Sequence, residues 1–162
     1  MVLEPARQKE LAVCMEIIGD GRRFQNEQGF VQWTDDYPDE ETIRNDIKNK
    51  TGYLLKTGEG AAGYLCIDFA GEPDYADIRG EWRTAEPYAV VHRLAFRREF
   101  RGMGLSNAAF AQTERLCAEN GIRSIRVDTD WSSLSMCRAG RSRMCFTMCW
   151  RSTTGWKRAG WI

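Results

Sequence analysis

The glycine-rich segment Arg101-Gly-Met-Gly104 has the residue types needed to bind an anion. It follows a run of apolar residues and precedes a helical pattern, so it lies where a strand turns into a helix. The first backbone N–H groups of a helix lack partners within the helix, and glycine lets a phosphate approach them without a Cβ in the way. Arg97 and Arg98 add positive charge nearby. The segment therefore predicts phosphate or pyrophosphate binding; the alternative is a tight turn that needs glycine only for its φ angles.

Two common phosphate-binding motifs do not match this segment. A P-loop needs Gly-Lys followed by Ser or Thr, and no such sequence follows here. A dinucleotide-binding fold needs glycine or alanine at position 107, where this chain has Asn107.

The spacing of cysteine and histidine predicts no metal site. The six cysteines, at positions 14, 66, 117, 137, 145 and 149, form no C-x-x-C pair, and His92 is the only histidine. We expect reduced thiols that pack as small apolar side chains.

The glycine segment lies inside a predicted strand–helix–strand unit. Residues 89–96 are nearly all apolar, which is typical of a central strand covered on both faces. A helical pattern runs from about 103 to 119 and stops at Asn120-Gly121, and a second strand covers 122–129. This order predicts a βαβ unit.

Upstream of this unit the pattern predicts helices and an antiparallel hairpin. One amphipathic helix covers 7–19, with Gly19 and Gly21 as its expected end, and a second covers 40–49 after the N-cap candidate Asp39. Residues 51–56 and 62–69 are the expected strands of the hairpin.

The stretch Glu99-Phe-Arg-Gly-Met-Gly104 resembles the [Q/R]-x-x-G-x-[G/A] motif of the GNAT-family N-acetyltransferases, with Glu99 in place of Gln or Arg. The flanking strands resemble the fourth and fifth strands of that family, and the resemblance covers roughly residues 1–136. It implies an α/β (α+β) fold with a mixed, mostly antiparallel sheet of six to seven strands flanked by helices. We expect one acetyltransferase-like domain over residues 1–162.

The resemblance implies transfer of an acetyl group from acetyl-CoA to a primary amine of a small molecule or peptide, by direct attack and without a metal. The thioester would lie between the diverging fourth and fifth strands. The pantetheine arm would pair with the backbone of Leu94, Ala95 and Phe96. The pyrophosphate would lie on the backbone of Arg101, Gly102, Met103, Gly104, Leu105 and Ser106.

Candidates for acid–base chemistry lie on the strand before the glycine segment. His92 is the main candidate for a base or a substrate-orienting group, and strand alternation would place it on one face with Leu94 and Phe96. The alternative is a histidine satisfied within the core. Glu86 and Tyr88 are weaker candidates, and Trp33, Trp82 and Tyr88 either line an acceptor pocket or pack the core.

The chain departs from the family pattern after residue 130. Ser133 stands where the family has an Asn near the CoA arm, no tyrosine follows Tyr88, and Cys145-Phe146 replaces a Gly-Phe pair. We still expect Ser133 to contact the cofactor.

The charges are balanced overall and unevenly distributed. The 23 basic and 23 acidic side chains give zero net charge, which excludes a general basic field for nucleic acid. All acidic residues lie at or before Asp130, so segment 137–162 is basic and rich in tryptophan and cysteine. A reading-frame slip in the gene near Met136 would produce such a break. The competing interpretation is a genuine tail that binds an anion such as nucleic acid or the CoA 3′-phosphate.

Two alternative functions therefore stay open: an inert CoA-binding module and a nucleic-acid binder that works through the tail. No apolar run is long enough to span a membrane, and the N-terminal residues carry no export signal, so we expect a cytoplasmic protein. The resemblance also allows a homodimer.

Overall fold

The computed structural model describes the backbone of residues 1–29, 32–73, 75, 84–130, 145–152 and 155–160, and side chains in these ranges as far as Val127. The strands are β1 (Val2–Pro5), β2 (Gly52–Thr57), β3 (Gly60–Asp68), β4 (Tyr88–Phe96), β5 (Ser124–Asp130), β6 (Cys145–Ser152) and β7 (Gly155–Gly160). The helices are α1 (Leu11–Glu27), α2 (Glu40–Lys48) and α3 (Leu105–Glu119), with short 3-10 turns η1 (Gln8–Glu10) and η3 (Arg98–Phe100).

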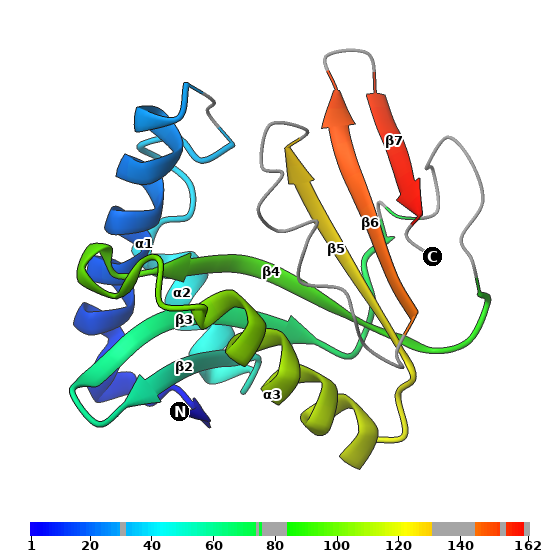
Figure 1. Cartoon of the computed structure of the whole chain (residues 1–162), viewed down its shortest axis with the longest axis horizontal. Helices are drawn as coiled ribbons and strands as arrows, with labels where there is room; N and C mark the ends of the chain where they lie inside the picture. Colours follow the sequence, from blue (N-terminus) through cyan, green and yellow to red (C-terminus); the bar gives the residue numbers. More distant parts are fainter. Residues whose placement is uncertain (30–31, 74, 76–83, 131–144, 153–154, 161–162) are drawn as a thin grey trace.

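The described strands form one sheet in the order of the sequence, from β1 to β7. β4 and β6 both run parallel to β5, and the other neighbouring pairs are antiparallel. This mixed, mostly antiparallel sheet flanked by helices confirms the predicted fold class (Figure 1).

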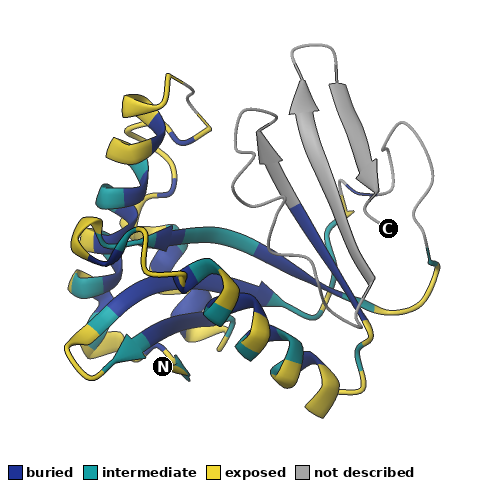
Figure 2. Cartoon of the chain, viewed as in Figure 1, coloured by how far each residue is buried: buried dark blue, intermediate teal, exposed yellow. Residues whose placement is uncertain are grey.

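Helices cover both faces of the sheet, as the apolar strand 89–96 predicted. On one face α1 and α2 pack their isoleucines against Leu54 and Tyr64 of the sheet. On the other face α3 places Phe110 and Cys117 against Leu65 and Val91. The buried positions therefore gather in the middle strands and on the inner sides of the helices (Figure 2).

The prediction that Gly19 and Gly21 end the first helix was wrong, because α1 continues through both to Glu27. Gly21 faces the sheet, where a Cβ would lie 2.6 Å from the Trp33 ring and 2.9 Å from the Ala95 side chain. Glycine at this position thus serves close packing of α1 on β4 and does not break the helix.

The predicted start of the second helix is confirmed. The Asp39 carboxylate accepts a hydrogen bond of 2.8 Å from the Thr42 backbone N–H, which caps α2. No pattern in the sequence predicted β1, a four-residue edge strand that pairs with β2.

The parallel pairing of β4 with β5 is short, and this shapes the centre of the molecule. The register runs only from Tyr88–Ser124 to Val91–Val127, although β4 continues to Phe96 and β5 to Asp130. Figure 1 shows the two strands running apart beyond their paired ends. The carboxyl-terminal half of β4 therefore has no paired strand on its β5 side among the described residues.

Candidate active site

The glycine segment forms an open turn between β4 and α3. Gly102 and Gly104 have φ angles of 80° and 73°, the left-handed region that costs other L-residues about 1–2 kcal/mol. A Cβ at either position would meet no atom within 4 Å, so the space beside this backbone is empty of described protein. Phe100 and Leu105, on either side of the turn, are buried in one cluster with Leu55 and fix its two ends.

The backbone N–H groups of residues 102–107 are available to a ligand. Among the described residues, none of these groups donates a hydrogen bond, and the first backbone bond of α3 runs from the Ala108 N–H to the Gly104 carbonyl at 3.3 Å. The start of a 15-residue helix adds the positive end of its dipole. This cradle fits a pyrophosphate or another compact anion.

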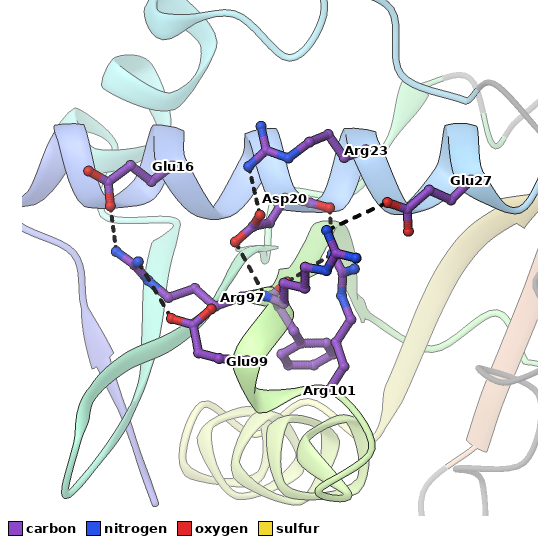
Figure 3. Close-up of polar contacts among 9 residues, drawn as sticks. Glu16, Asp20, Arg23, Glu27, Arg97, Glu99 and Arg101 are labelled. Atoms are coloured by element: carbon purple, nitrogen blue, oxygen red, sulfur yellow. Dashed lines mark hydrogen bonds and ion pairs between the residues drawn. The ribbon is translucent and has the colours of Figure 1, made fainter.

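The arginines next to the turn are paired with acidic residues of α1, as Figure 3 shows. Arg97 bonds the Glu16 carboxylate at 2.6 Å, and Arg98 lies 4.0 Å from the Glu27 carboxylate. The Asp20 carboxylate accepts from the Arg98 backbone N–H at 3.3 Å. The positive charge of Arg97 and Arg98 near the turn is therefore partly neutralised. Their ion pairs with Glu16 and Glu27 also hold the turn against α1.

Asp20 and Arg101 form the inner part of this contact. Although burial acts in the opposite direction, hydrogen bonds from Arg23 and Arg98 lower the pKa of the Asp20 carboxyl. The Arg101 guanidinium donates to the backbone carbonyls of Asp20 and Phe96 and lies 4.5 Å from the centre of the Phe24 ring. Burial lowers the pKa of Arg101. The Arg101 side chain thus packs against α1, so its guanidinium does not reach into the open space beside the turn.

A bulge interrupts β4 just after its pairing with β5 ends. His92 pairs with Cys66 and Ala95 with Tyr64, so Arg93 and Leu94 together face Leu65 of β3. Arg93 has a φ of 54°, one of two positive values among the described non-glycine residues. This geometry is that of a β-bulge, a feature that often re-aims side chains beside active sites.

The bulge overturns the predicted shared face of His92, Leu94 and Phe96. His92 lies opposite Cys66, on the α2 side of the sheet, whereas Leu94 and Phe96 pack against the α3-side cluster around Leu105. An extra residue in the strand reverses the alternation beyond it, which an unbroken apolar run cannot reveal.

His92 lies beside a carboxylate that the sequence did not single out. Its Nε2 atom is 3.6 Å from the Glu72 carboxylate, and both side chains are partly buried. Glu72 belongs to a loop after β3 and has no motif around it, so only the folded chain brings the two together. The contact joins the middle of β4 to the loop that follows β3.

The other two candidates lie further from the open turn. Tyr88 starts β4, four residues before His92, or about 13 Å along the strand. Its ring stacks with Tyr75 and lies 3.4 Å from the guanidinium carbon of Arg126. Glu86 is exposed just before the strand.

Several predicted positions lie outside the described residues or their side chains. Trp82 and Ser133 fall outside the described backbone, and nothing is described for the side chains of segment 137–162. Trp33 is buried in the core of the α1 face, against Gly21. In the part of the chain with described side chains, no group of three or more His, Cys, Asp or Glu residues is placed to hold a metal ion. None of the described helices is long and apolar enough to cross a membrane.

Comparison with known proteins agrees with this geometry. Residues 20–138 match the sequence model of the acetyltransferase (GNAT) family, a stretch that ends at the second residue of the basic segment 137–162. A search of curated proteins finds no significant match.

Solved structures of acetyltransferases share the fold. A GNAT-family acetyltransferase from Streptococcus agalactiae 2603 has a TM-score of 0.77 and 26% identity, covering 85% of this chain and 80% of its own. A predicted acetyltransferase from Clostridium acetobutylicum, solved with acetyl-CoA, has a TM-score of 0.57 at 12% identity and covers 88% of this chain and 90% of its own. An aminoglycoside acetyltransferase from an uncultured soil metagenomic sample, in complex with sisomicin, has a TM-score of 0.55 at 15% identity, with 86% of each chain covered.

The family match covers well over half of the sequence and includes β4, the open glycine turn and α3. The chain therefore belongs to the acetyltransferase (GNAT) family.

Proposed function

We propose that this protein transfers an acetyl group from acetyl-CoA to a primary amine of a small molecule or peptide, by direct attack of the amine. The observation that carries the proposal is the open turn of residues 101–106, in which the backbone N–H groups from Gly102 onward have no partner among the described residues. The turn follows the part of β4 that lies beyond its pairing with β5. Family membership supplies the reaction class.

In this proposal the backbone of the turn binds the pyrophosphate of the cofactor. The predicted residues Gly102, Met103, Gly104, Leu105 and Ser106 contribute their N–H groups, whereas the N–H of Arg101 already donates to the Arg98 carbonyl at 3.3 Å. Because the neighbouring arginines already bond α1, backbone N–H groups and the helix dipole provide most of the attraction. The unpaired edge of β4 at Leu94, Ala95 and Phe96 then binds the pantetheine arm through main-chain hydrogen bonds.

The chemistry needs an acyl donor and a proton acceptor. Acetyl-CoA, when bound, supplies the acetyl group as a thioester: the C–S bond breaks as the C–N bond of the amide forms, and CoA leaves as its thiol. His92 accepts the proton of the attacking amine, and the Glu72 carboxylate 3.6 Å from its Nε2 stabilises the resulting imidazolium. Glu86 and Tyr88 are the second candidates for this role. Orientation of the amine beside the thioester carries a large part of the rate enhancement.

A small-molecule amine is the first acceptor class to test. The likeness to an aminoglycoside acetyltransferase solved with sisomicin supports this choice for the proposed activity. Peptide amines form the second class.

Two measurements test the proposed function. Acetyl-CoA at 100 times its dissociation constant stabilises a folded binder by about 2.7 kcal/mol, so the unfolding temperature rises by several degrees. Acetyl-pantetheine, which lacks the pyrophosphate, is the matched control and gives a much smaller rise. A panel of amines is then assayed for release of the CoA thiol.

The outcomes separate the alternatives. Binding with amine-dependent thiol release supports the transferase. Binding without release for any amine points to an inert CoA-binding module. No rise in unfolding temperature with acetyl-CoA contradicts the proposal.

A further inference from the structure

A buried ion pair connects α2 to the bulge of β4. The Arg93 guanidinium donates through Nε and Nη2 to the two carboxylate oxygens of Asp46, at 2.9 and 2.6 Å. Only 13% of the Arg93 side chain and 9% of the Asp46 side chain are exposed. This two-pronged contact fixes direction as well as distance, because both groups are planar.

Two tyrosines complete the cluster around this pair. The Tyr64 hydroxyl of β3 donates to Asp46 at 2.8 Å, and the Arg93 guanidinium donates to the Tyr37 hydroxyl at 3.0 Å. Burial and the nearby Asp46 charge raise the pKa of Tyr64, so it stays a hydroxyl donor. A Cβ on Gly52 would lie 2.9 Å from the Tyr64 hydroxyl and 3.3 Å from the Asp46 Cβ. The cluster is thus closely packed, and its hydrogen bonds join α2, β3 and β4.

The backbone of Arg93 is in a conformation that glycine adopts far more readily. Its φ of 54° belongs to the left-handed region, and a residue in this conformation at a bulge is usually glycine. Nothing in the local sequence favours such a conformation for arginine. The side-chain bonds to Asp46 therefore offset the cost and select one arrangement of the bulge.

The bulge lies between the paired part of β4 and the residues proposed to bind pantetheine, so its conformation affects the proposed reaction. The last β4–β5 pair is Val91–Val127, and His92 and Arg93 are the next two residues of β4. It also directly precedes Leu94, where the proposed pantetheine strip begins. A change in the bulge would move His92 and the backbone of residues 92–94, beside which the acyl end of acetyl-CoA would lie, while Ala95 and Phe96 stay paired with Tyr64 and Gly63 of β3.

We propose that Asp46 and Arg93 are positioning residues, which hold the backbone of residues 92–94 in the conformation that receives the acyl end of acetyl-CoA. This inference rests on the proposed function. It assigns to α2, which contributes no other candidate residue, the task of setting the geometry where β4 and β5 part.

Two conservative variants test the proposal. Asp46→Asn keeps the shape of the side chain and removes its charge, and Arg93→Lys keeps the charge and removes the two-pronged contact. Lys56→Met is the matched control, because it removes two other partly buried ion pairs, to Glu4 and Glu10. Lys56 pairs with Ala61 near the hairpin turn, whereas Leu65, which faces the bulge, pairs with Tyr53. Cooperative thermal unfolding establishes that each variant is folded.

The decisive readout compares acetyl-CoA with CoA by calorimetric titration. A positioning role predicts that both variants lose affinity for acetyl-CoA while their affinity for CoA stays within about twofold of the wild type, and that kcat falls about 10- to 100-fold. Lys56→Met leaves both affinities and kcat at their wild-type values. Should both variants fail to fold, Tyr64→Phe, which removes one bond to Asp46 without burying a charge, shows a smaller loss of the same kind.

The contrary results are equally distinct. Equal weakening of acetyl-CoA and CoA, or an unchanged kcat in folded Asp46→Asn, shows a purely structural ion pair and overturns the proposal. A wild-type protein that binds acetyl-CoA and releases thiol, with variants that match it, overturns this inference alone. A wild type that does neither overturns the proposed function, and this inference with it.

Discussion

At the scale of single residues, the glycine turn and the surroundings of the proposed base, His92, differ in how far the sequence could predict them. The role proposed for Gly102 and Gly104 uses only their own backbone, so their spacing before a helical pattern was enough to predict the turn. The pairing of His92 with Glu72 depends on a loop folding back onto β4. No local pattern marks Glu72, which is why only the structure shows this contact.

The His92–Glu72 pair gives the first prediction at this scale. His92→Gln should lower kcat by 10²- to 10⁴-fold because it removes the proton acceptor, while the affinity for acetyl-CoA changes little. Glu72→Gln should give a smaller loss of kcat, since it removes only the stabilising charge. Steady-state kinetics with the best amine and titration with acetyl-CoA measure both effects.

Glu86→Gln is the comparison for this prediction. It should leave kcat near the wild-type value, because Glu86 is exposed before the strand begins. A large loss in Glu86→Gln together with an active His92→Gln would move the base to Glu86.

At the scale of elements, the periodicity of the sequence predicted most helices and strands. It did not predict the two irregularities, the glycines inside α1 and the bulge in β4. The cap of α2 and the hairpin of β2 and β3 appear where the sequence predicted them. The continuation of α1 through Gly21 depends on the distant Trp33 ring, and the bulge at Arg93 depends on Asp46 in another element. Both irregularities are tertiary effects that override local preference.

The two glycines of α1 provide a matched pair of substitutions. Alanine is favoured over glycine inside a helix by about 1 kcal/mol, so Gly19→Ala, whose Cβ would meet only the mobile end of Arg23, should raise stability by up to that amount. Gly21→Ala should lower stability by about 1–2 kcal/mol, because its Cβ overlaps Trp33 and Ala95. Urea unfolding of both variants measures the difference; equal stabilisation by both would contradict the packing described for α1.

At the scale of the whole molecule, the arrangement of layers was predictable and the distribution of charge contacts was not. A hairpin followed by a βαβ unit predicts a mixed sheet with helices on both faces. The acidic residues of α1 meet the arginines after β4 across about 80 positions of sequence, with no local signal on either side. These contacts hold the first helix against the turn, so the proposed cofactor site adjoins residues from both halves of the described chain.

The central claim is that the backbone at the start of α3 binds the pyrophosphate of acetyl-CoA. Gly102→Asp would place a carboxylate in the open space where the phosphates should lie. Gly121→Asp is its control, because Gly121 has a similar φ of 72°, equally open surroundings and a place at the other end of the same helix. Aspartate tolerates this φ better than most residues, so both variants carry a similar backbone cost.

Calorimetric titration of these two variants with acetyl-CoA is the most direct measurement. We predict that Gly102→Asp binds about 100-fold more weakly than the wild type, equivalent to about 2.7 kcal/mol, and that Gly121→Asp binds as the wild type does. Equal affinity in the two variants would show that the cofactor does not lie on this turn.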